Sequence, residues 1–188
     1  MSPVADSSIT KKALATALKE LIEEQPFQKI SVGDICERCQ MNRKSFYYHF
    51  RDKYDLVNWI FDTEFIETVK NSSVQNTWDA FGVLCDYFYE NRSFYRKALK
   101  IEGQNSFTDH FRQLCQPVIA KQVEELAKDE AVTSFYVNFF ADAILCAIER
   151  WLLEKNCPSS EQFKKQLTVC SRLIVESARM SLEDENQK

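Results

Sequence analysis

Residues 31–53 constrain the fold of this chain most, because their pattern predicts two short helices joined by a tight turn. Ser31 followed three residues later by Asp34 forms a capping box, which marks the start of the first helix. Asn42 is a favourable N-cap for the second helix, whose outer face carries basic and aromatic residues. A helix-turn-helix of this kind fits the major groove of DNA, where the second helix reads the bases.

The rest of the chain is predicted to be helical as well. Three glycines and four prolines among 188 residues, with Val and Thr thinly spread, favour helix over strand. Pro117 should kink the seventh helix or mark a later start. Apolar spacing and capping residues predict about nine helices, at 9–22, after Ser31, after Asn42, from Asp52 to about Val69, and at about 76–91, 93–101, 106–128, 132–156 and 159–182.

These elements indicate an all-α protein with two domains. Residues 1–52 would form an N-terminal three-helix domain that contains the helix-turn-helix, and residues 53–188 a larger helical domain. The net charge of −4 lies mostly in the second part, because residues 1–55 hold nine Lys and Arg against eight Asp and Glu. A near-neutral region can still bind DNA if its basic side chains share one face.

The sequence carries no recognisable export or membrane signal. No apolar run approaches the ~20 residues that span a bilayer, and residues 1–6 have neither the basic nor the apolar region of a signal peptide. We therefore expect a cytoplasmic protein. Its seven cysteines are an odd number and mostly fall on or beside apolar helix positions, so we expect small buried side chains without a disulfide framework.

The second helix of the motif offers several groups to DNA. Arg43 and Lys44 stand at its N-terminal end, where guanine edges are within reach, and the start of the first helix can bind a phosphate through backbone N–H groups. The alternative is an ordinary surface helix whose basic side chains and tyrosines are hydrated and bind no partner. The candidate DNA contacts are Ser31, Val32, Asn42, Arg43, Lys44, Ser45, Tyr47, Tyr48, His49 and Lys53.

A specific set of residues then points to a family. It consists of Ile9, Ile30-Ser31-Val32, Asp34-Ile35, Ser45-Phe46-Tyr47-Tyr48-His49-Phe50 and Lys53. Residues 9–55 thereby resemble the N-terminal domain of the TetR family of bacterial transcription regulators. The resemblance implies that residues 53–188 are a dimerisation and effector domain. It also implies a homodimer that binds a palindromic double-stranded DNA operator, usually under the control of a ligand.

Within the family, residues 10–14 and 53–60 resemble the branch named for regulators of dihydroxyacetone kinase operons. This similarity suggests control of dihydroxyacetone metabolism, by a small-molecule effector or by a protein co-regulator. Two positions depart from the family pattern, because Gln40 and Lys44 stand where glycine is usual. A residue other than glycine costs ~1 kcal/mol at Gln40 if the turn keeps a positive φ.

The last two long helices are expected to pair with their copies in a dimer. Residues 135–153 are apolar on more than one side, which suggests burial both by their own domain and by a second chain. The candidate dimer interface consists of Ile144, Ile148, Trp151, Leu167, Cys170 and Ile174.

Aromatic residues in the body could line a ligand cavity between the fourth helix and the helices at 76–101 and 106–128. Packing of the same side chains in a closed core is an equally good interpretation. The candidate ligand-binding residues are Phe61, Phe65, Phe88, Tyr89, His110, Phe111 and Gln113.

Other chemistry has weaker support. Cys36 and Cys39 have the spacing of half a zinc site but lack a second pair, so we expect neither a metal nor another cofactor. Asp109-His110 with Cys115 lacks the surroundings of a nucleophile, which argues against an enzyme. The alternative to a DNA-binding regulator is a helical adaptor whose basic helix binds a protein partner. Salt dependence would separate the two, because phosphate contacts weaken steeply with salt.

Overall fold

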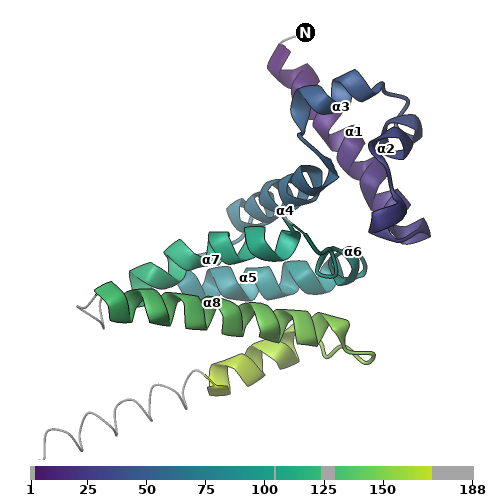
Figure 1. Cartoon of the computed structure of the whole chain (residues 1–188). Coiled ribbons are helices and arrows are strands. Elements are labelled where there is room, and N and C mark those ends of the chain that lie inside the picture. Colours follow the sequence, from purple (N-terminus) through teal and green to yellow (C-terminus); the bar gives the residue numbers. More distant parts are fainter. Residues whose placement is uncertain (1–2, 104, 124–129, 171–188) are drawn as a thin grey trace, which may run out of the picture.

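The computed structural model describes residues 3–103, 105–123 and 130–170, and these contain helices but no strand (Figure 1). The all-α prediction is therefore confirmed. The helices are α1 (Pro3–Glu24), the 3-10 helix η1 (Phe27–Lys29), α2 (Val32–Arg38), α3 (Arg43–His49), α4 (Lys53–Lys70), α5 (Thr77–Glu90), α6 (Arg92–Ala98), α7 (Phe107–Val123), α8 (Glu130–Leu153) and a further helical stretch at 160–170.

Helices α1, α2 and α3 form a small bundle, here called the head (Figure 1). The predicted caps are confirmed: Ser31 and Asp34 exchange both bonds of a capping box, and Asn42 Oδ1 accepts a hydrogen bond from Ser45 N at 2.8 Å. Leu18 from α1 and Phe46 from α3 are fully buried in the head. Local capping thus sets where α2 and α3 begin, and the apolar core sets how they pack.

The turn between α2 and α3 keeps the left-handed backbone that glycine usually supplies. Gln40 has a φ of 56°, and the following residue, Met41, donates its N–H to Cys36 O at 2.8 Å. The chain therefore carries the expected strain of ~1 kcal/mol at this position.

Helix α4 runs from the head into the body, which comprises α5 to α8 and the stretch at 160–170 (Figure 1). Asp52 caps α4 by accepting from Tyr54 N and Asp55 N, both at 2.8 Å. Further along, Phe61 of α4 enters an aromatic core with ring centroids 4.8–6.4 Å apart. This core contains Phe61, Phe65, Tyr87, Phe88, Tyr95, Phe107 and Phe111.

Some sequence-based expectations about the body need correction. Helix α7 continues through Pro117, so this proline does not mark a later start. The predicted ends of two helices, at 124–128 and 171–182, lie outside the described residues. None of the described helices has the length and apolarity needed to cross a membrane.

The cysteines are free, as expected, but not all of them are buried. Burial raises the pKa of Cys85 to about 12 and that of Cys115 to about 11, which keeps these thiols protonated and unreactive. Cys146 and Cys170 are exposed. The expectation of burial is wrong for these two, because their helix faces point away from the body of this chain.

Candidate nucleic-acid interface

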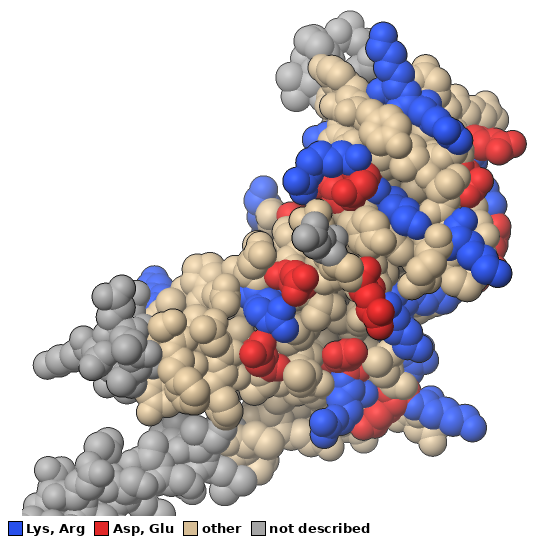
Figure 2. Space-filling model, viewed as in Figure 1, with Lys and Arg blue, Asp and Glu red and all other residues tan. Residues whose placement is uncertain are grey.

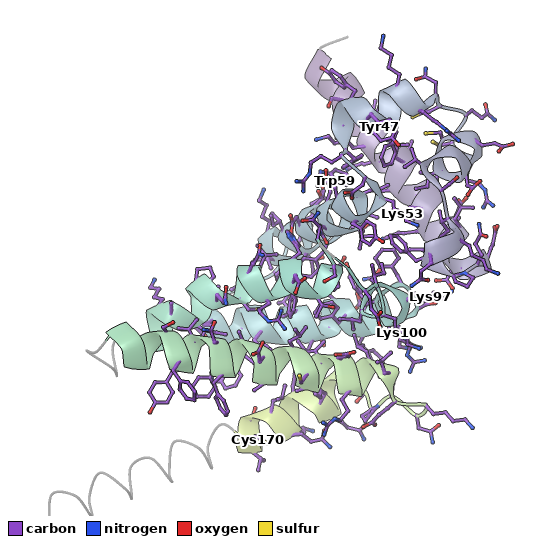
Figure 3. All side chains as sticks on the ribbon, viewed as in Figure 1. Tyr47, Lys53, Trp59, Lys97, Lys100 and Cys170 are labelled. Atoms are coloured by element: carbon purple, nitrogen blue, oxygen red, sulfur yellow. The ribbon has the colours of Figure 1, made fainter. Side chains whose placement is uncertain are left out.

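Helix α3 presents one face to solvent and buries the other. Arg43, Lys44, Tyr47 and Tyr48 follow the i, i+1, i+4, i+5 spacing of a single helix face, and all four are exposed. Tyr48 keeps 82% of its surface accessible, whereas Phe46 keeps none. Figure 3 shows Tyr47 at the end of the molecule away from the body. These four predicted DNA contacts therefore share one accessible surface.

The two cations of this face form no close ion pair with a described acidic residue, although the charge of Arg43 contributes to lowering the pKa of Asp34. Within the described residues, neither Arg43 nor Lys44 has a carboxylate within 4.0 Å. Arg38, in contrast, is held by Glu24 at 2.6 Å and by Glu20 at 3.4 Å. Figure 2 shows Lys and Arg side chains over the head, where acidic side chains also occur. Arg43 and Lys44 at the start of α3 are thus among the cations of the head that have no described carboxylate within 4.0 Å.

Arg43 is also held in place by the adjacent helix. Its guanidinium lies directly over Gly33 in the first turn of α2, so that a Cβ atom on Gly33 would come within 2.5 Å of Arg43 Nη2. Any larger residue at position 33 would displace this side chain. The absence of a side chain at Gly33 thus creates the space in which Arg43 rests between α2 and α3.

The remaining predicted DNA contacts differ in how accessible their polar groups are. Asn42 Oδ1 is occupied by capping, and it also accepts from Ser45 Oγ at 3.2 Å. Ser31 is exposed and Val32 is half-buried at the start of α2. His49 lies against the Tyr48 ring at 4.8 Å, and burial, followed by the charge of Lys11, lowers its pKa. His49 is therefore neutral at pH 7.

Lys53, one of the predicted DNA contacts, is directed into the head and does not point freely into solvent. Its Nζ donates to Phe27 O and Ile30 O at 2.7 Å each and reaches Gln28 O at 3.4 Å. The ammonium also lies 4.4 Å from the centre of the Phe27 ring, and burial lowers its pKa. Its three donors are directed at backbone carbonyls. In this conformation Lys53 ties the start of α4 to η1.

The predicted ligand-binding residues separate into two groups. Phe61, Phe88 and Phe111 pack on one another, with ring centroids 5.4–5.7 Å apart, so core packing describes them here. Phe65 stacks on Phe61, and Tyr89 stacks on Trp151 instead. His110 and Gln113 line a cavity of about 710 Å³. Its lining residues are Arg51, Asp55, Asn58, Trp59, Asp62, Asn105, Asp109, His110, Arg112, Gln113 and Gln116.

Two residues of the predicted dimer interface are buried within their own chain. Ile148 is fully buried, and Trp151 stacks on Phe163 at 4.2 Å and donates its indole N–H to Pro158 O at 2.8 Å. The prediction that these two form an intermolecular contact is wrong, because Phe163 and Pro158 contact Trp151 within the chain and the side chain of Ile148 has no accessible surface. Ile144 and Leu167 are half-buried, Cys170 is exposed, and Ile174 lies outside the described residues.

Three exposed aromatic residues of α8 were missing from that predicted interface. Phe135, Tyr136 and Phe139 keep 66%, 41% and 54% of their surface accessible. The wide apolar stripe of this segment was the signal that could have identified them. The described residues contain no cluster of His, Cys, Asp and Glu suited to a metal ion.

Two family descriptions match the sequence and together cover both parts of the fold. Residues 14–60 match bacterial regulatory proteins of the tetR family. Residues 75–172 match the C-terminal region of transcriptional regulators of the same family. The first match contains the whole helix-turn-helix, and the second begins just before α5.

Individual relatives agree with this assignment. The HTH-type dhaKLM operon transcriptional activator DhaS of Lactococcus lactis subsp. lactis (strain IL1403) is 32% identical over 149 residues, covering 77% of this chain and 79% of the relative. The solved structure of a dihydroxyacetone kinase operon activator DhaS superposes with a TM-score of 0.61 at 25% identity, covering 92% of this chain and 97% of the other. A TetR transcriptional regulator from Streptococcus agalactiae 2603V shares the fold, with a TM-score of 0.66 at 20% identity over 86% and 93% of the two chains.

Proposed function

Because the chain belongs to the TetR family of bacterial transcription regulators, we propose that it binds a palindromic operator as a homodimer and thereby controls the expression of nearby genes. In this proposal residues 1–52 are the DNA-binding domain and residues 53–188 the dimerisation and effector domain. The family places the chain among DNA-binding regulators, and the proposal adds which residues contact DNA, how the chains pair and what is controlled.

The accessible face of α3 carries this proposal. Arg43 and Lys44 are exposed cations at the N-terminal end of a helix that is fixed by the Asn42 cap and by buried Phe46. This end of a recognition helix contacts base edges in the major groove, where Arg and Lys bond to guanine. Hydroxyl groups of Tyr47 and Tyr48 would donate to phosphates on either side of the groove.

Further phosphate contacts are proposed at the start of α2 and beside α3. The backbone N–H group of Val32 lies at a helix start, where the helix dipole favours an anion, whereas that of Ser31 already donates to Asp34 Oδ2 at 2.8 Å. Ser45 and neutral His49 would complete the set from α3. We exclude Lys53 from it, because its ammonium is directed at three carbonyls of the head.

Dimerisation is proposed through the exposed apolar side chains of α8 and of the stretch at 160–170. Phe135, Tyr136 and Phe139 expose aromatic area on α8, and Val169 exposes 57% of its surface nearer the end of the described chain. Large exposed apolar patches mark interaction surfaces. One short reading helix also makes too few contacts for specificity within a genome, so two heads must act together on paired half-sites.

The target of regulation is proposed from the named relatives. One is an activator of the dhaKLM operon and another an activator of a dihydroxyacetone kinase operon. We propose that this chain likewise controls an operon for dihydroxyacetone metabolism. Its effector would be either a small molecule or a protein co-regulator.

The experiment that tests the DNA-binding proposal selects sequences from a random duplex library with the purified full-length chain. The expected result is a palindrome with two half-sites, bound with an affinity that falls steeply with salt as counterions are released. Binding the region upstream of a dihydroxyacetone kinase operon would support the proposed target. Selection of no duplex, or an affinity that does not respond to salt, would favour the adaptor interpretation.

A further inference from the structure

The glycine at position 33 is not required by the backbone. Gly33 lies in the first turn of α2, and among the described residues Gly103 is the one glycine with a positive φ. A glycine within a helix is less favourable than an alanine, because it loses more conformational freedom on folding. What distinguishes Gly33 is therefore the group that covers it.

The guanidinium of Arg43 is this covering group. A Cβ atom at position 33 would lie 2.5 Å from Arg43 Nη2 and 3.3 Å from both Cζ and Nε, and these are the three nearest atoms that it would meet. A Cβ atom essentially never approaches another atom as closely as 2.5 Å, so a methyl group would displace the guanidinium. Because the displaced group ends a flexible side chain, the movement costs the fold little. The glycine thus affects the direction of Arg43 more than the stability of the head.

Gly82, the other glycine within a described helix, has different surroundings. It lies in α5 of the body, and a Cβ atom there would lie 3.8 Å from Lys164 Cδ, which is an ordinary van der Waals contact. An alanine at this position would displace no neighbouring side chain. Gly82 therefore offers a matched control for the effect of a methyl group at Gly33.

The guanidinium keeps its hydrogen-bond donors available while it lies over Gly33. It forms no hydrogen bond with another described residue and has no described carboxylate within 4.0 Å. Asp34 attracts it only weakly, because hydrogen bonds from Ser31 lower the pKa of Asp34 most and the charge of Arg43 contributes less. Support from α2 without pairing leaves the planar fork of N–H donors for a base edge.

We propose that Gly33 determines operator specificity, because its missing side chain lets α2 orient the guanidinium of Arg43 toward one base pair of each half-site. Arg43 stands at the N-terminal end of α3, and α2 and α3 pack against each other in the head (Figure 1). A supported arginine loses fewer side-chain conformations on bonding to guanine than a mobile one does. Gly33 acts through Arg43 and is therefore a positioning residue. This role rests on the proposed function, in which Arg43 reads a base.

The first measurement follows Arg43 in the full chain without DNA. NMR relaxation at Nε reports the motion of each arginine side chain, and Arg43→Lys identifies the Arg43 signal by its loss. This signal should be more ordered than that of Arg51, whose side chain keeps 74% of its surface accessible. Gly33→Ala should make Arg43 as mobile as Arg51, whereas Gly82→Ala should leave its motion unchanged.

The second measurement uses the operator selected from the duplex library. Gly33→Ala should weaken binding about two- to tenfold and relax the preference at the same base pair as Arg43→Ala. In an Arg43→Ala background, Gly33→Ala should change neither affinity nor preference, because its effect passes through the missing side chain. Gly82→Ala should bind as wild type does. A merely structural role of Gly33 would instead weaken binding to all sequences in both backgrounds.

Folding is controlled by the melting temperature of each variant. Gly33→Ala and Gly82→Ala should both melt at or above the temperature of wild type, because alanine favours a helix more than glycine does. If Gly33→Ala does not fold, the wild-type relaxation decides. An Arg43 side chain that is more ordered than Arg51 supports the proposal, and one that is equally mobile overturns it.

With folded variants, three results would overturn the proposal: an Arg43 side chain whose motion does not change in Gly33→Ala, an unchanged base preference in that variant, or an equal loss of affinity with and without the Arg43 side chain. Selection of no duplex at all would refute the proposed function and with it the role in specificity. The relaxation measurement would then still decide whether Gly33 orients Arg43, so the two failures are distinguishable.

Discussion

At the scale of single residues, the start of α3 is proposed to determine which bases are read. Arg43→Ala or Lys44→Ala should weaken binding to the selected operator by roughly 1–3 kcal/mol and relax the preference at one base pair per half-site. Tyr48→Phe should instead weaken binding to all sequences about equally, because its hydroxyl is proposed to contact phosphate. Footprints and library selections of the three variants measure these changes in base preference and in affinity. An unchanged footprint in both alanine variants would remove α3 from the reading role.

Lys53 provides a second residue-scale prediction, because the structure gives it a role in stability. Lys53→Met keeps the aliphatic stem but leaves the carbonyls of Phe27 and Ile30 without their 2.7 Å donor. It should lower the free energy of unfolding by roughly 1–3 kcal/mol in urea. Lys29→Met, on the exposed part of η1, is the matched control and should have little effect.

The salt dependence of DNA binding decides between the two roles of this lysine. If Lys53 is a structural tie, the slope of log affinity against log salt should stay as in wild type. A stable Lys53→Met protein whose slope is smaller by about one would show that the ammonium contacts phosphate in the complex.

At the scale of elements, the turn between α2 and α3 stores strain that a substitution can release. Gln40→Gly should raise the free energy of unfolding by ~1 kcal/mol, since Gln40 has a φ of 56° and glycine adopts this backbone without a steric penalty. Asn105 has a φ of 64°, but asparagine tolerates this region, so Asn105→Gly should gain less. Urea denaturation measures the free energy of unfolding of both variants. An equal gain in Gln40→Gly and Asn105→Gly would contradict an origin in backbone strain at Gln40.

Helix α4 is the element that joins the head to the body through polar contacts as well as apolar ones. Glu64 on α4 accepts both from Lys19 on α1, at 2.5 and 2.6 Å, and from Tyr87 on α5, at 3.1 Å. Tyr87 and Tyr95 share a further hydrogen bond of 2.6 Å, and burial raises the pKa of both phenols, so they remain neutral. Helix α1 of the head, the connecting helix α4 and the body helices α5 and α6 thus share one network.

At the scale of the whole molecule, the proposed dimer surface can be separated from the core by two substitutions on α8. Phe139→Glu places a charge on an exposed aromatic position and should give a folded monomer in light scattering. Ile148→Glu places a charge in the buried interior and should lower the melting temperature severely instead. A wild-type chain that is monomeric at micromolar concentration, or a dimer that survives Phe139→Glu, would contradict the proposed surface.

The sequence by itself determined the features that depend on neighbours a few residues away. Periodicity and capping residues identified the helices and the caps Ser31, Asn42 and Asp52, because each involves contacts within about four positions. The unusual backbone at Gln40 was expected from the family resemblance. The same local string carried the family resemblance that the comparisons confirm.

Only the tertiary structure decided which face of each helix is covered and by what. Trp151 and Ile148 have the apolar character of an interface, yet both are buried within their own chain, and Trp151 stacks on Phe163. Phe139 on the same helix stays exposed. Lys53 reaches carbonyls 23–26 residues away, and Asn58 meets Asn105 across 47 residues. Such long-range partners have no signature in local sequence, because packing between distant segments alone brings these groups together.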